Sequence, residues 1–330
     1  MAPPADPERP AAAASPLRRL LARRAGVRAA LGRLFDGRGF VEVDTPVLSS
    51  EVMPEAHIDP IPVAVDGARG GIHWLQASPE ALMKRLLARG SGPIYQFARS
   101  FRAGERGTLH DVEFVLLEWY APEATLDSTA PLLEEVCRTV LGTEGIDRVT
   151  CRDAFLGHAG IDPHAATLGD WRRAGDRLGL GIAPPHDTDA DADSWFEMIL
   201  AGVVGPRLGR GGRPTMLEAW PATQSAFARL DPGDPSLARR FELFVDGVEL
   251  ANGWEEDPDR DLLARRIDAA NRIRSAAGRE TLPCPRRVLE AHGPGMPEGV
   301  GAALGFDRLV MLAAGATTID AARPFGVGEA

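Results

Sequence analysis

The stretch FRAGERGTLHDVEFVLLEWY, residues 101–120, decides the fold of this chain. An extended run that carries Arg102 leads into a turn rich in charge and glycine. A second, apolar run follows and carries Glu113, Phe114 and Glu118. Two such runs around a glycine-containing turn are typical of an antiparallel hairpin. Arginine pairs with phosphate oxygens in bidentate geometry, and an aromatic ring stacks on a base. The hairpin therefore predicts a site for a nucleotide.

A second stretch, late in the chain, has the pattern of a strand that runs into a helix. Residues 299–312 read GVGAALGFDRLVML. The small residues predict a tightly packed strand, the segment from Gly305 to Arg308 predicts a turn, and the apolar run predicts a helix. This stretch places a second arginine, Arg308, near the end of a strand.

Two shorter stretches complete the pattern. Residues 248–256, VELANGWEE, place Glu249 and Glu256 seven residues apart, on either side of an Asn-Gly pair that predicts a turn. Residues 39–48, GFVEVDTPVL, predict a strand that runs to about Leu48. Strands dominate the four stretches and predicted helices flank them, so the predicted fold class is α+β around an antiparallel sheet.

These stretches, in this order, resemble the sequence motifs of the class II aminoacyl-tRNA synthetases of the lysyl type. Residues 101–120 closely resemble motif 2, residues 299–312 resemble motif 3, and residues 39–48 resemble motif 1. The resemblance covers almost the whole chain and implies a class II catalytic domain, an antiparallel sheet flanked by helices. It also implies a homodimer, because the motif 1 proline, here Pro46, lies at the dimer interface in that family.

The resemblance implies a site for ATP and Mg²⁺. Arg102 would hold the α-phosphate and Arg308 the γ-phosphate, and Phe114 would enclose the adenine ring together with Arg308. Glu249 would bind Mg²⁺ at the phosphates, with Glu256 as a second candidate metal ligand. The chemistry needs positioning and charge neutralisation, so Arg102 and Arg308 are the predicted catalytic residues. The other positions that map onto ATP contacts are Gly104, Glu105, His110, Asp111, Leu250 and Gly305.

The resemblance also implies a pocket for a diamino acid. A buried carboxylate without a cationic partner is unfavourable, so acids in a pocket favour a cationic ligand. Lysyl-tRNA synthetases generally have glycine at the position of Ala303, and one added methyl group changes discrimination by about 1–3 kcal/mol. The positions that map onto substrate contacts are Ser78, Glu80, Glu118, Tyr120, Asn252, Glu256 and Ala303.

Several of these residues also have a purely structural interpretation. Most arginines are solvated surface residues, and Glu249 would form a cross-strand ion pair. An acid at Glu80, in the first turn of a predicted helix, is favoured by the helix dipole alone. Asn252 fits the turn preference of Asn-Gly, and Ala303 fits a tightly packed strand.

Two parts of the hairpin depart from the lysyl pattern. Lysyl synthetases typically read Arg-Asn-Glu where this chain reads RAGE from Arg102, so the carboxylate stands one residue later, at Glu105. They read His-Asn-Pro-Glu-Phe where this chain reads HDVEF from His110, so Asp111 replaces an amide. Asp111 would either accept a hydrogen bond from the adenine amino group or pair with Arg106. These departures keep a non-catalytic, synthetase-like regulatory module as an alternative.

The composition restricts the partners. The chain has 330 residues, 37 basic and 47 acidic, with a formal net charge of −10. This balance disfavours a long nucleic acid such as tRNA as the main partner. No apolar run approaches the roughly 18 residues that span a bilayer, and residues 1–16 lack the pattern of a secretory signal. Three well-separated cysteines predict buried thiols in a reducing cytoplasm: Cys137, Cys151 and Cys284.

The predicted organisation is a single catalytic domain over residues 16–330 after a disordered Pro/Ala tail over residues 1–15. A helical insertion occupies residues of about 150–215. Its acidic segment, residues 187–194, predicts a solvated turn, because it lacks the central glycine and closing glutamate of a calcium loop. Residues 17–35 predict a helix with six arginines, which form either a solvated face or a docking face for an acidic protein.

No anticodon-binding domain precedes the predicted motif 1 strand. The chain therefore resembles a family of truncated lysyl-tRNA synthetase paralogues, the elongation factor P–(R)-β-lysine ligases, which have alanine at the position of Ala303. That family activates (R)-β-lysine with ATP and transfers the β-lysyl group to a lysine side chain of translation elongation factor P. The alternative enzyme is a lysine-activating amide or tRNA ligase of the same fold.

Overall fold

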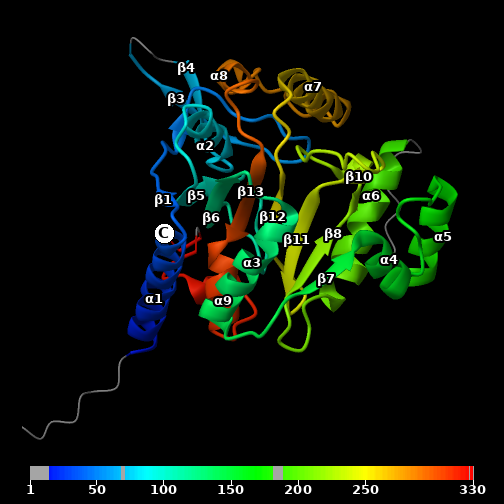
Figure 1. The fold of residues 1–330 in the computed structure, drawn as a ribbon, viewed down its shortest axis with the longest axis horizontal. Coiled ribbons are helices and arrows are strands. Elements are labelled where there is room, and N and C mark those ends of the chain that lie inside the picture. The colour runs from blue at the N-terminus through cyan, green and yellow to red at the C-terminus, as the bar shows by residue number, and fades with distance from the viewer. Residues whose placement is uncertain (1–14, 68–70, 181–188, 327, 330) are drawn as a thin grey trace, which may run out of the picture.

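An eight-stranded sheet forms the centre of the computed structural model, which describes residues 15–67, 71–180, 189–326 and 328–329 (Figure 1). The first and last pairs of neighbouring strands are parallel, and all pairs between them are antiparallel. The predicted α+β class is confirmed. In spatial order the strands are β1 (Val41–Glu42), β5 (Ile94–Phe101), β6 (Glu113–Pro122), β13 (Gly299–Gly305), β12 (Val248–Glu255), β11 (Arg240–Val245), β8 (Thr215–Glu218) and β7 (Asp147–Thr150).

Helices and two small sheets surround this sheet. The small sheets contain β2 (Leu48–Ser49), β4 (Gly71–Leu75) and β3 (Ile61–Val65), and β10 (Leu237–Ala238) with β9 (Trp220–Pro221). The α-helices are α1 (Pro16–Gly37), α2 (Glu80–Leu87), α3 (Leu126–Leu141), α4 (Cys151–Ala159), α5 (Leu168–Leu178), α6 (Asp189–Ile199), α7 (Arg260–Ala276), α8 (Arg286–Ala291) and α9 (Phe306–Ala313). Short helices are η1 (Leu200–Val204), η2 (Gly205–Arg207), η3 (Ala222–Gln224) and η4 (Ile319–Ala322). Among the residues described, no helix is both long and apolar enough to cross a membrane.

Side-chain alternation in β6 separates the core from the opposite face of the sheet. Leu117 and Trp119 are fully buried and belong to the main core, which also contains side chains of α1, α3 and α9. Successive residues of a strand point to opposite faces, so Phe114, Glu118 and Tyr120 lie on the other face. The predicted hairpin is confirmed, since all of β5 pairs with residues 113–120 of β6, and Arg102 lies directly after β5.

A second core lies under the helices of residues 151–207. Figure 1 shows α4, α5 and α6 gathered at the β7 edge of the sheet. Six buried aromatic side chains contribute to this core, and several pack ring against ring: Phe155, Trp171, Trp195, Phe196, Trp220 and Phe244. The acidic segment for which the sequence predicts a turn is helical from Asp189 onwards, and its first two residues lie outside the described chain.

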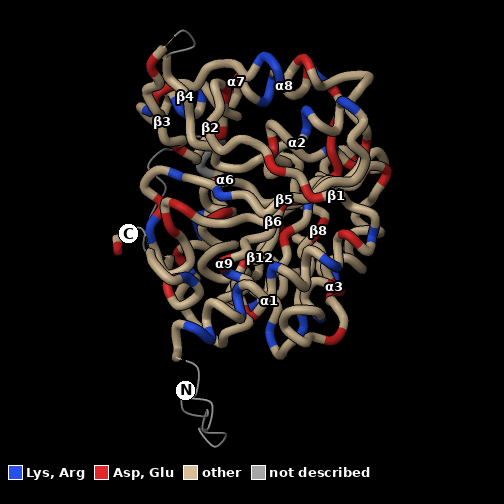
Figure 2. Tube along the Cα trace, turned by 90° about the vertical axis from the view of Figure 1, so that its left-hand side faces the viewer, with Lys and Arg blue, Asp and Glu red and all other residues tan. Residues whose placement is uncertain are grey.

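The arginine-rich helix α1 begins as predicted, with Ser15 as N-cap and Pro16 at its first position. The expectation of a solvated arginine face is only partly right, because several of its arginines contact the protein. Arg24 Nη1 lies 2.5 Å from Asp307 Oδ1, and Arg28 lies over the ring of Phe97. Figure 2 shows basic positions along α1 and, elsewhere on the trace, basic and acidic positions interspersed.

Three local predictions are wrong. The Asn252-Gly253 pair lies inside β12 and not in a turn, because both residues pair with β11 on one side and β13 on the other. Glycine is needed at position 253, since a Cβ there would lie 2.6 Å from the Ala302 Cβ. The chain reverses instead at Asp246 and Gly247, whose φ values of 50° and 78° suit a tight hairpin. No turn separates Gly305 from α9, and Cys284 is exposed, unlike the other two cysteines.

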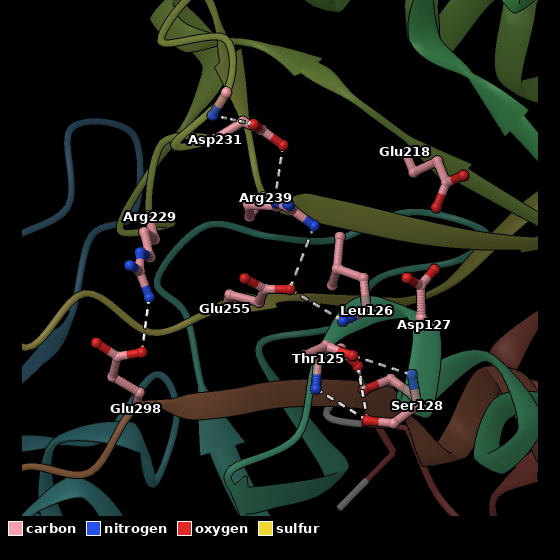
Figure 3. Close-up of polar contacts among 12 residues, drawn as sticks. Thr125, Leu126, Asp127, Ser128, Glu218, Arg229, Asp231, Arg239, Glu255 and Glu298 are labelled. Atoms are coloured by element: carbon pink, nitrogen blue, oxygen red, sulfur yellow. Dashed lines mark hydrogen bonds and ion pairs between the residues drawn. The ribbon is translucent and has the colours of Figure 1, made fainter.

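A network of hydrogen bonds and ion pairs surrounds the C-terminal end of β12 (Figure 3). The Glu255 carboxylate accepts a hydrogen bond from the Leu126 backbone N–H at 3.1 Å, at the start of α3. Arg239 Nη1 lies 3.7 Å from the same carboxylate, and Arg229 pairs with Glu298 at 2.7 Å. Because neighbouring residues of a strand face opposite ways, this network places Glu256 toward the other face of the sheet.

Candidate active site

A cavity of about 280 Å³ lies on the sheet face opposite the main core. Three neighbouring strands, β6, β13 and β12, form its floor, and the loop between β5 and β6 forms part of its wall. Most of the residues predicted from the sequence line it together: Ser78, Glu80, Arg102, Glu105, His110, Asp111, Phe114, Glu118, Tyr120, Glu249, Leu250, Asn252, Ala303, Gly305 and Arg308. Gly104 and Glu256 are not among the lining residues.

The register of the floor strands explains why small residues occupy β13. Ala303 is the partner of Glu118 in β6 and of Asn252 in β12. Gly301 is the partner of Tyr120, and a Cβ at Gly301 would lie 2.5 Å from Tyr120 Cε1. Glycine and alanine therefore leave the space above β13 open between the polar side chains of the two outer strands.

A bulge in β12 brings Glu249 to the cavity. Two successive residues of β11 pair with Ala251 and Glu249, which leaves Leu250 as an extra residue. In a regular strand, residues seven apart such as Glu249 and Glu256 point to opposite faces. One extra residue reverses the alternation, so Glu249 shares its face with Asn252.

One end of the cavity presents an arginine beside an aromatic ring. The guanidinium carbon of Arg102 lies 5.0 Å from the centroid of the Phe114 ring. Glu105 Oε1 lies 3.8 Å from Nη1 of Arg102. Within the described residues, Nε of Arg102 makes no hydrogen bond. A buried donor on a guanidinium that faces a cavity fits an anionic ligand such as phosphate.

Arg308 forms the other cationic group at this end. It donates hydrogen bonds to the backbone oxygens of Glu249 at 2.7 Å and Leu109 at 3.2 Å. Its Nη2 also lies 2.7 Å from Nε2 of His110. A guanidinium only donates, so this ring nitrogen accepts and carries no proton. Burial, and then the charge of Arg308, lower the pKa of His110, which favours the neutral ring.

Glu249 is the one predicted metal ligand that lines the cavity. Its side chain is 43% exposed, and its Oε2 lies 3.5 Å from Nη1 of Arg308. Among the residues that the structure describes, no group of three or more His, Cys, Asp or Glu side chains forms a ready metal site. Mg²⁺ commonly binds through one or two carboxylates together with substrate phosphates, so Glu249 fits such a shared site.

The opposite end of the cavity is acidic, and Glu118 is its central group. Oε2 of Glu118 accepts a hydrogen bond from the Ser78 hydroxyl at 2.7 Å, and Oε1 accepts one from the Tyr120 hydroxyl at 2.8 Å. Burial, and then the neighbouring Glu80, raise the pKa of Glu118 to about 8. At neutral pH this carboxyl group therefore holds a proton until a cation comes close.

Lys84 is a residue that the sequence did not predict, and it changes the interpretation of two others. Its ammonium lies 2.7 Å from Glu80 Oε1 and 2.8 Å from Glu256 Oε2, and the residue is 1% exposed. Burial lowers the pKa of Lys84, but the carboxylates of Glu256 and Glu80 outweigh it and raise this pKa above its usual value. These two acids thus already have a cation.

The two predicted metal ligands have different surroundings. The Glu256 carboxylate is buried against Lys84 and is not among the residues that line the cavity, whereas Glu249 is. Glu256 remains close to the floor, because a Cβ on Gly301 would lie 2.5 Å from its Oε1.

Glu55 is a second residue that the sequence did not predict. It lines the cavity from a loop without regular structure, and burial raises its pKa to about 7 although Arg102 opposes the shift. The buried Arg274 of α7 holds this loop by donating from Nη1 to the backbone oxygens of Glu55 at 3.1 Å and Ile58 at 2.8 Å. A loop position shows no periodicity, so nothing local in the sequence indicates it.

Comparison with known proteins identifies the family. A family model described as tRNA synthetases class II (D, K and N) matches residues 12–328. The chain belongs to this class II tRNA synthetase family. The predicted resemblance to class II catalytic domains of the lysyl type is thereby confirmed at the level of this family, and the stretches that resemble motifs 2 and 3 provide β6, β13 and the cavity between them.

Several similar proteins share the same name. A protein of Pectobacterium atrosepticum named elongation factor P–(R)-β-lysine ligase is 38% identical over 314 residues, which cover 94% of this chain and 95% of the relative. Proteins with the same name from Edwardsiella ictaluri and Yersinia enterocolitica are each 37% identical, over 313 and 319 residues. They cover 94% and 96% of this chain, and 95% and 97% of their own lengths. The predicted resemblance to this group of class II ligases is confirmed.

The departures from the lysyl pattern in motif 2 have structural explanations. Gly104 has a φ of +75°, which glycine adopts without strain, and Glu105 takes the place at the cavity wall. Asp111 is 1% exposed and pairs with Arg106 at 3.1 Å and with Arg323. The predicted pairing with Arg106 is confirmed, and a second guanidinium, that of Arg323, pairs with the same carboxylate.

We predict that Lys84→Met destabilises the protein by about 3–5 kcal/mol, because it leaves the buried carboxylates of Glu80 and Glu256 without a cation. Urea unfolding followed by circular dichroism measures this change. Arg89→Met, at an exposed position just after α2, is the matched control and should change stability by less than about 0.5 kcal/mol. Equal effects of the two substitutions would contradict the role of Lys84.

Proposed function

We propose that this chain is an ATP-dependent ligase that activates (R)-β-lysine as an adenylate and transfers the β-lysyl group to a lysine side chain of elongation factor P. The observation that carries this proposal is a single cavity with opposite ends of opposite character. Arginines and an aromatic ring lie at one end, and carboxylates lie at the other, on the floor of a class II catalytic domain. The shared name of the relatives supports the choice of substrates.

The acidic end suits a diamino acid. Glu55, Glu80 and Glu118 line that end, and Glu256 lies close to its floor. The ammonium of Lys84 pairs with Glu80 and Glu256 and neutralises only part of the total charge. The raised pKa values of Glu118 and Glu55 have the same cause, burial among like charges without enough cations. A substrate with two ammonium groups supplies the missing positive charge, which an ordinary neutral side chain does not.

The basic end suits ATP. We propose that Arg102 binds the α-phosphate, that Arg308 binds the γ-phosphate, and that the adenine stacks on Phe114. The free Nε donor of Arg102 and the position of Phe114 on the same cavity wall support these roles. Glu249 would hold Mg²⁺, which supplies charge neutralisation at the phosphates when it is bound. His110, Glu105, Leu250 and Gly305 would complete the wall around the nucleotide.

The chemistry has two displacement steps. A carboxylate oxygen of the amino acid attacks the α-phosphorus, and the bond from that phosphorus to pyrophosphate breaks. The neutral amine of the acceptor lysine then attacks the carbonyl carbon, and the bond to AMP breaks. Arg102 would stabilise charge on the α-phosphate in both steps, so positioning and electrostatics provide the catalysis.

Ala303 is proposed to select the substrate backbone. Its Cβ stands in register between Glu118 and Asn252, which are both proposed substrate contacts. An alanine at this point occupies space that glycine would leave free. Ser78 and Tyr120 would fix the orientation of Glu118 by the two hydroxyl groups that donate to it.

The acceptor and the location follow from the same proposal. The net charge of −10 supports a protein acceptor over tRNA, because phosphate-rich partners favour basic surfaces. Elongation factor P acts in translation, so we infer a cytoplasmic location, which cell fractionation tests. Mass spectrometry of elongation factor P after incubation with the enzyme, ATP and (R)-β-lysine tests the acceptor, and an unmodified factor would argue against it.

We further propose a homodimer through the motif 1 region. Four large apolar side chains on α1 and in the motif 1 region are exposed: Leu17 at 54% and Leu21 at 45% on α1, and Val41 at 57% and Leu48 at 39% in the motif 1 region. Pro46 is also exposed between the last two. Burial of these side chains against a second copy would remove apolar surface from water, which supports the proposal. Sedimentation equilibrium should give a dimer for the wild type and a monomer for Leu48→Glu, and a wild-type monomer would contradict the proposal.

We predict that ATP–pyrophosphate exchange is fastest with (R)-β-lysine, slower with α-lysine and absent without an amino acid. Arg308→Ala should reduce the exchange rate by about a hundredfold or more, because it removes a preorganised cation at the phosphates. Arg89→Ala, at an exposed position outside the cavity, should leave the rate unchanged.

The other outcomes of this experiment separate the alternatives. Preference for α-lysine would favour a lysine-activating ligase of the same fold and remove the selective role of Ala303. No exchange with any amino acid would favour a non-catalytic module.

We predict that the KM for β-lysine falls by up to about tenfold per pH unit as the pH rises from about 6 to 8. The pKa of Glu118 is about 8 in the free protein, so below that pH the carboxyl group must lose a proton before it pairs with an ammonium. Glu118→Gln should raise the KM and remove most of this pH dependence. Glu113→Gln, which is on the same strand but outside the cavity lining, is the control.

The pH dependence of the free energy of unfolding, measured without ligand, tests the raised pKa of Glu118 in a second way. The folded state binds the Glu118 proton more tightly than the unfolded state, whose pKa stays near 4.5. The free energy of unfolding therefore loses this contribution as the pH rises from about 4.5 to 8. A pH profile identical in the wild type and in Glu118→Gln would contradict the assignment.

A further inference from the structure

The loop between β5 and β6, residues 102–112, is held by a segment from far along the chain. This 319–323 segment consists of η4 and Arg323. The backbone N–H of Ile319 donates to the Thr108 oxygen at 2.9 Å. Arg323 Nη1 donates to the backbone oxygen of Glu113 at 2.7 Å, at the point where β6 begins. The loop is thus fixed at its middle and at its end.

A buried ion pair also joins the 319–323 segment to the loop of residues 102–112. Nη2 of Arg323 pairs with Oδ2 of Asp111, and the side chains are 9% and 0% exposed. Oδ1 of Asp111 accepts a hydrogen bond from the Val112 backbone N–H at 2.8 Å. Arg106 adds a second guanidinium to Asp111 at 3.1 Å. A carboxylate buried to this extent depends on its cations, so the pair holds Asp111 in one place.

The same loop carries the acceptors that orient Arg308. The Leu109 oxygen accepts from Nε of Arg308 at 3.2 Å, and His110 accepts from its Nη2 at 2.7 Å. His110 and Asp111 are neighbours in the chain, and both line the cavity. A displacement of Asp111 therefore moves the two groups that aim the Arg308 guanidinium at the cavity.

We propose that Arg323 and Asp111 are a pair of positioning residues that set the motif 2 loop, and through it His110 and Arg308, for binding of ATP. The acid at position 111, which differs from the amide of the lysyl pattern, is explained by its partner in the 319–323 segment. This inference rests on the proposed function, because it assumes that the basic end of the cavity binds ATP.

The experiment is a double-mutant cycle with Asp111→Asn, Arg323→Gln and the double variant, all as the full chain. Isothermal calorimetry with ATP and Mg²⁺ measures the nucleotide dissociation constant. Exchange kinetics measure the KM for ATP and for β-lysine separately. Each single variant should weaken ATP binding about tenfold and leave the KM for β-lysine within about twofold. The double variant should bind ATP no more weakly than each single variant, because each single substitution already removes the same contact.

Two further variants separate positioning from general damage to the fold. Arg323→Lys keeps the charge but cannot contact Asp111 and the Glu113 oxygen together. Compared with Arg323→Gln, it should therefore recover part of the ATP affinity, and its circular dichroism spectrum should match that of the wild type. Asp320→Asn alters the same segment at a half-exposed carboxylate, which lies 3.2 Å from Arg106 and 3.5 Å from Arg323. Because exposed pairs contribute little, this variant should change ATP binding by less than about twofold.

Three outcomes would overturn the inference: unchanged ATP affinity in the single variants, equal increases in both KM values, or additive losses in the double variant. Equal increases would assign the pair a structural role only. A wild-type protein that binds no ATP would instead reject the proposed function. Wild-type binding of ATP with unchanged variants would leave the proposed function intact and reject the positioning role alone.

Discussion

The alternation of side chains across β6, β13 and β12 is the constraint on which the rest of the structure depends. One face of these strands carries apolar side chains such as Leu117 and Trp119, which bury the sheet under α1, α3 and α9. The other face carries the polar groups that line the cavity, with Glu118 between Ser78 and Tyr120. Successive residues of the same strands supply the two faces in turn. A shift of strand register by one residue would therefore disrupt the apolar core and the cavity lining together.

Charge balance is the second organising feature. Lys84 neutralises Glu80 and Glu256 inside the protein, and Glu118 and Glu55 remain without an ion pair among the described residues. Such a pocket favours a cationic ligand, because the ammonium group of the ligand would pair with these two carboxyl groups. The internal lysine limits how much positive charge the substrate must supply. This explains how three carboxylates at one end of the cavity and the adjacent Glu256 lie close together.

Distant segments hold the basic end in place. Asp307 joins Arg24 of α1 to the backbone N–H of Val115 in β6, at 2.5 Å and 2.9 Å. The 319–323 segment holds the facing loop through Asp111. Arg308 thus lies between two anchored elements, and its guanidinium is oriented by backbone oxygens and by His110 before any ligand binds. Preorganisation of this kind reduces the reorganisation that binding and catalysis require.

The amino-acid sequence was enough to predict the hairpin of residues 101–120 and the strand that leads to a helix at residues 299–312, because local periodicity and short motifs encode them. Most of the residues that line the cavity followed from the family resemblance that these motifs carry, but Lys84 and Glu55 did not. The packed structure was needed to show which carboxylates are already paired, that Leu250 is a bulge, and that Asn252 lies inside a strand. These features depend on contacts between residues far apart in the chain, such as Lys84 with Glu256 and Asp111 with Arg323. A local pattern carries no record of such partners, because the free energy that selects them arises only when the segments pack together.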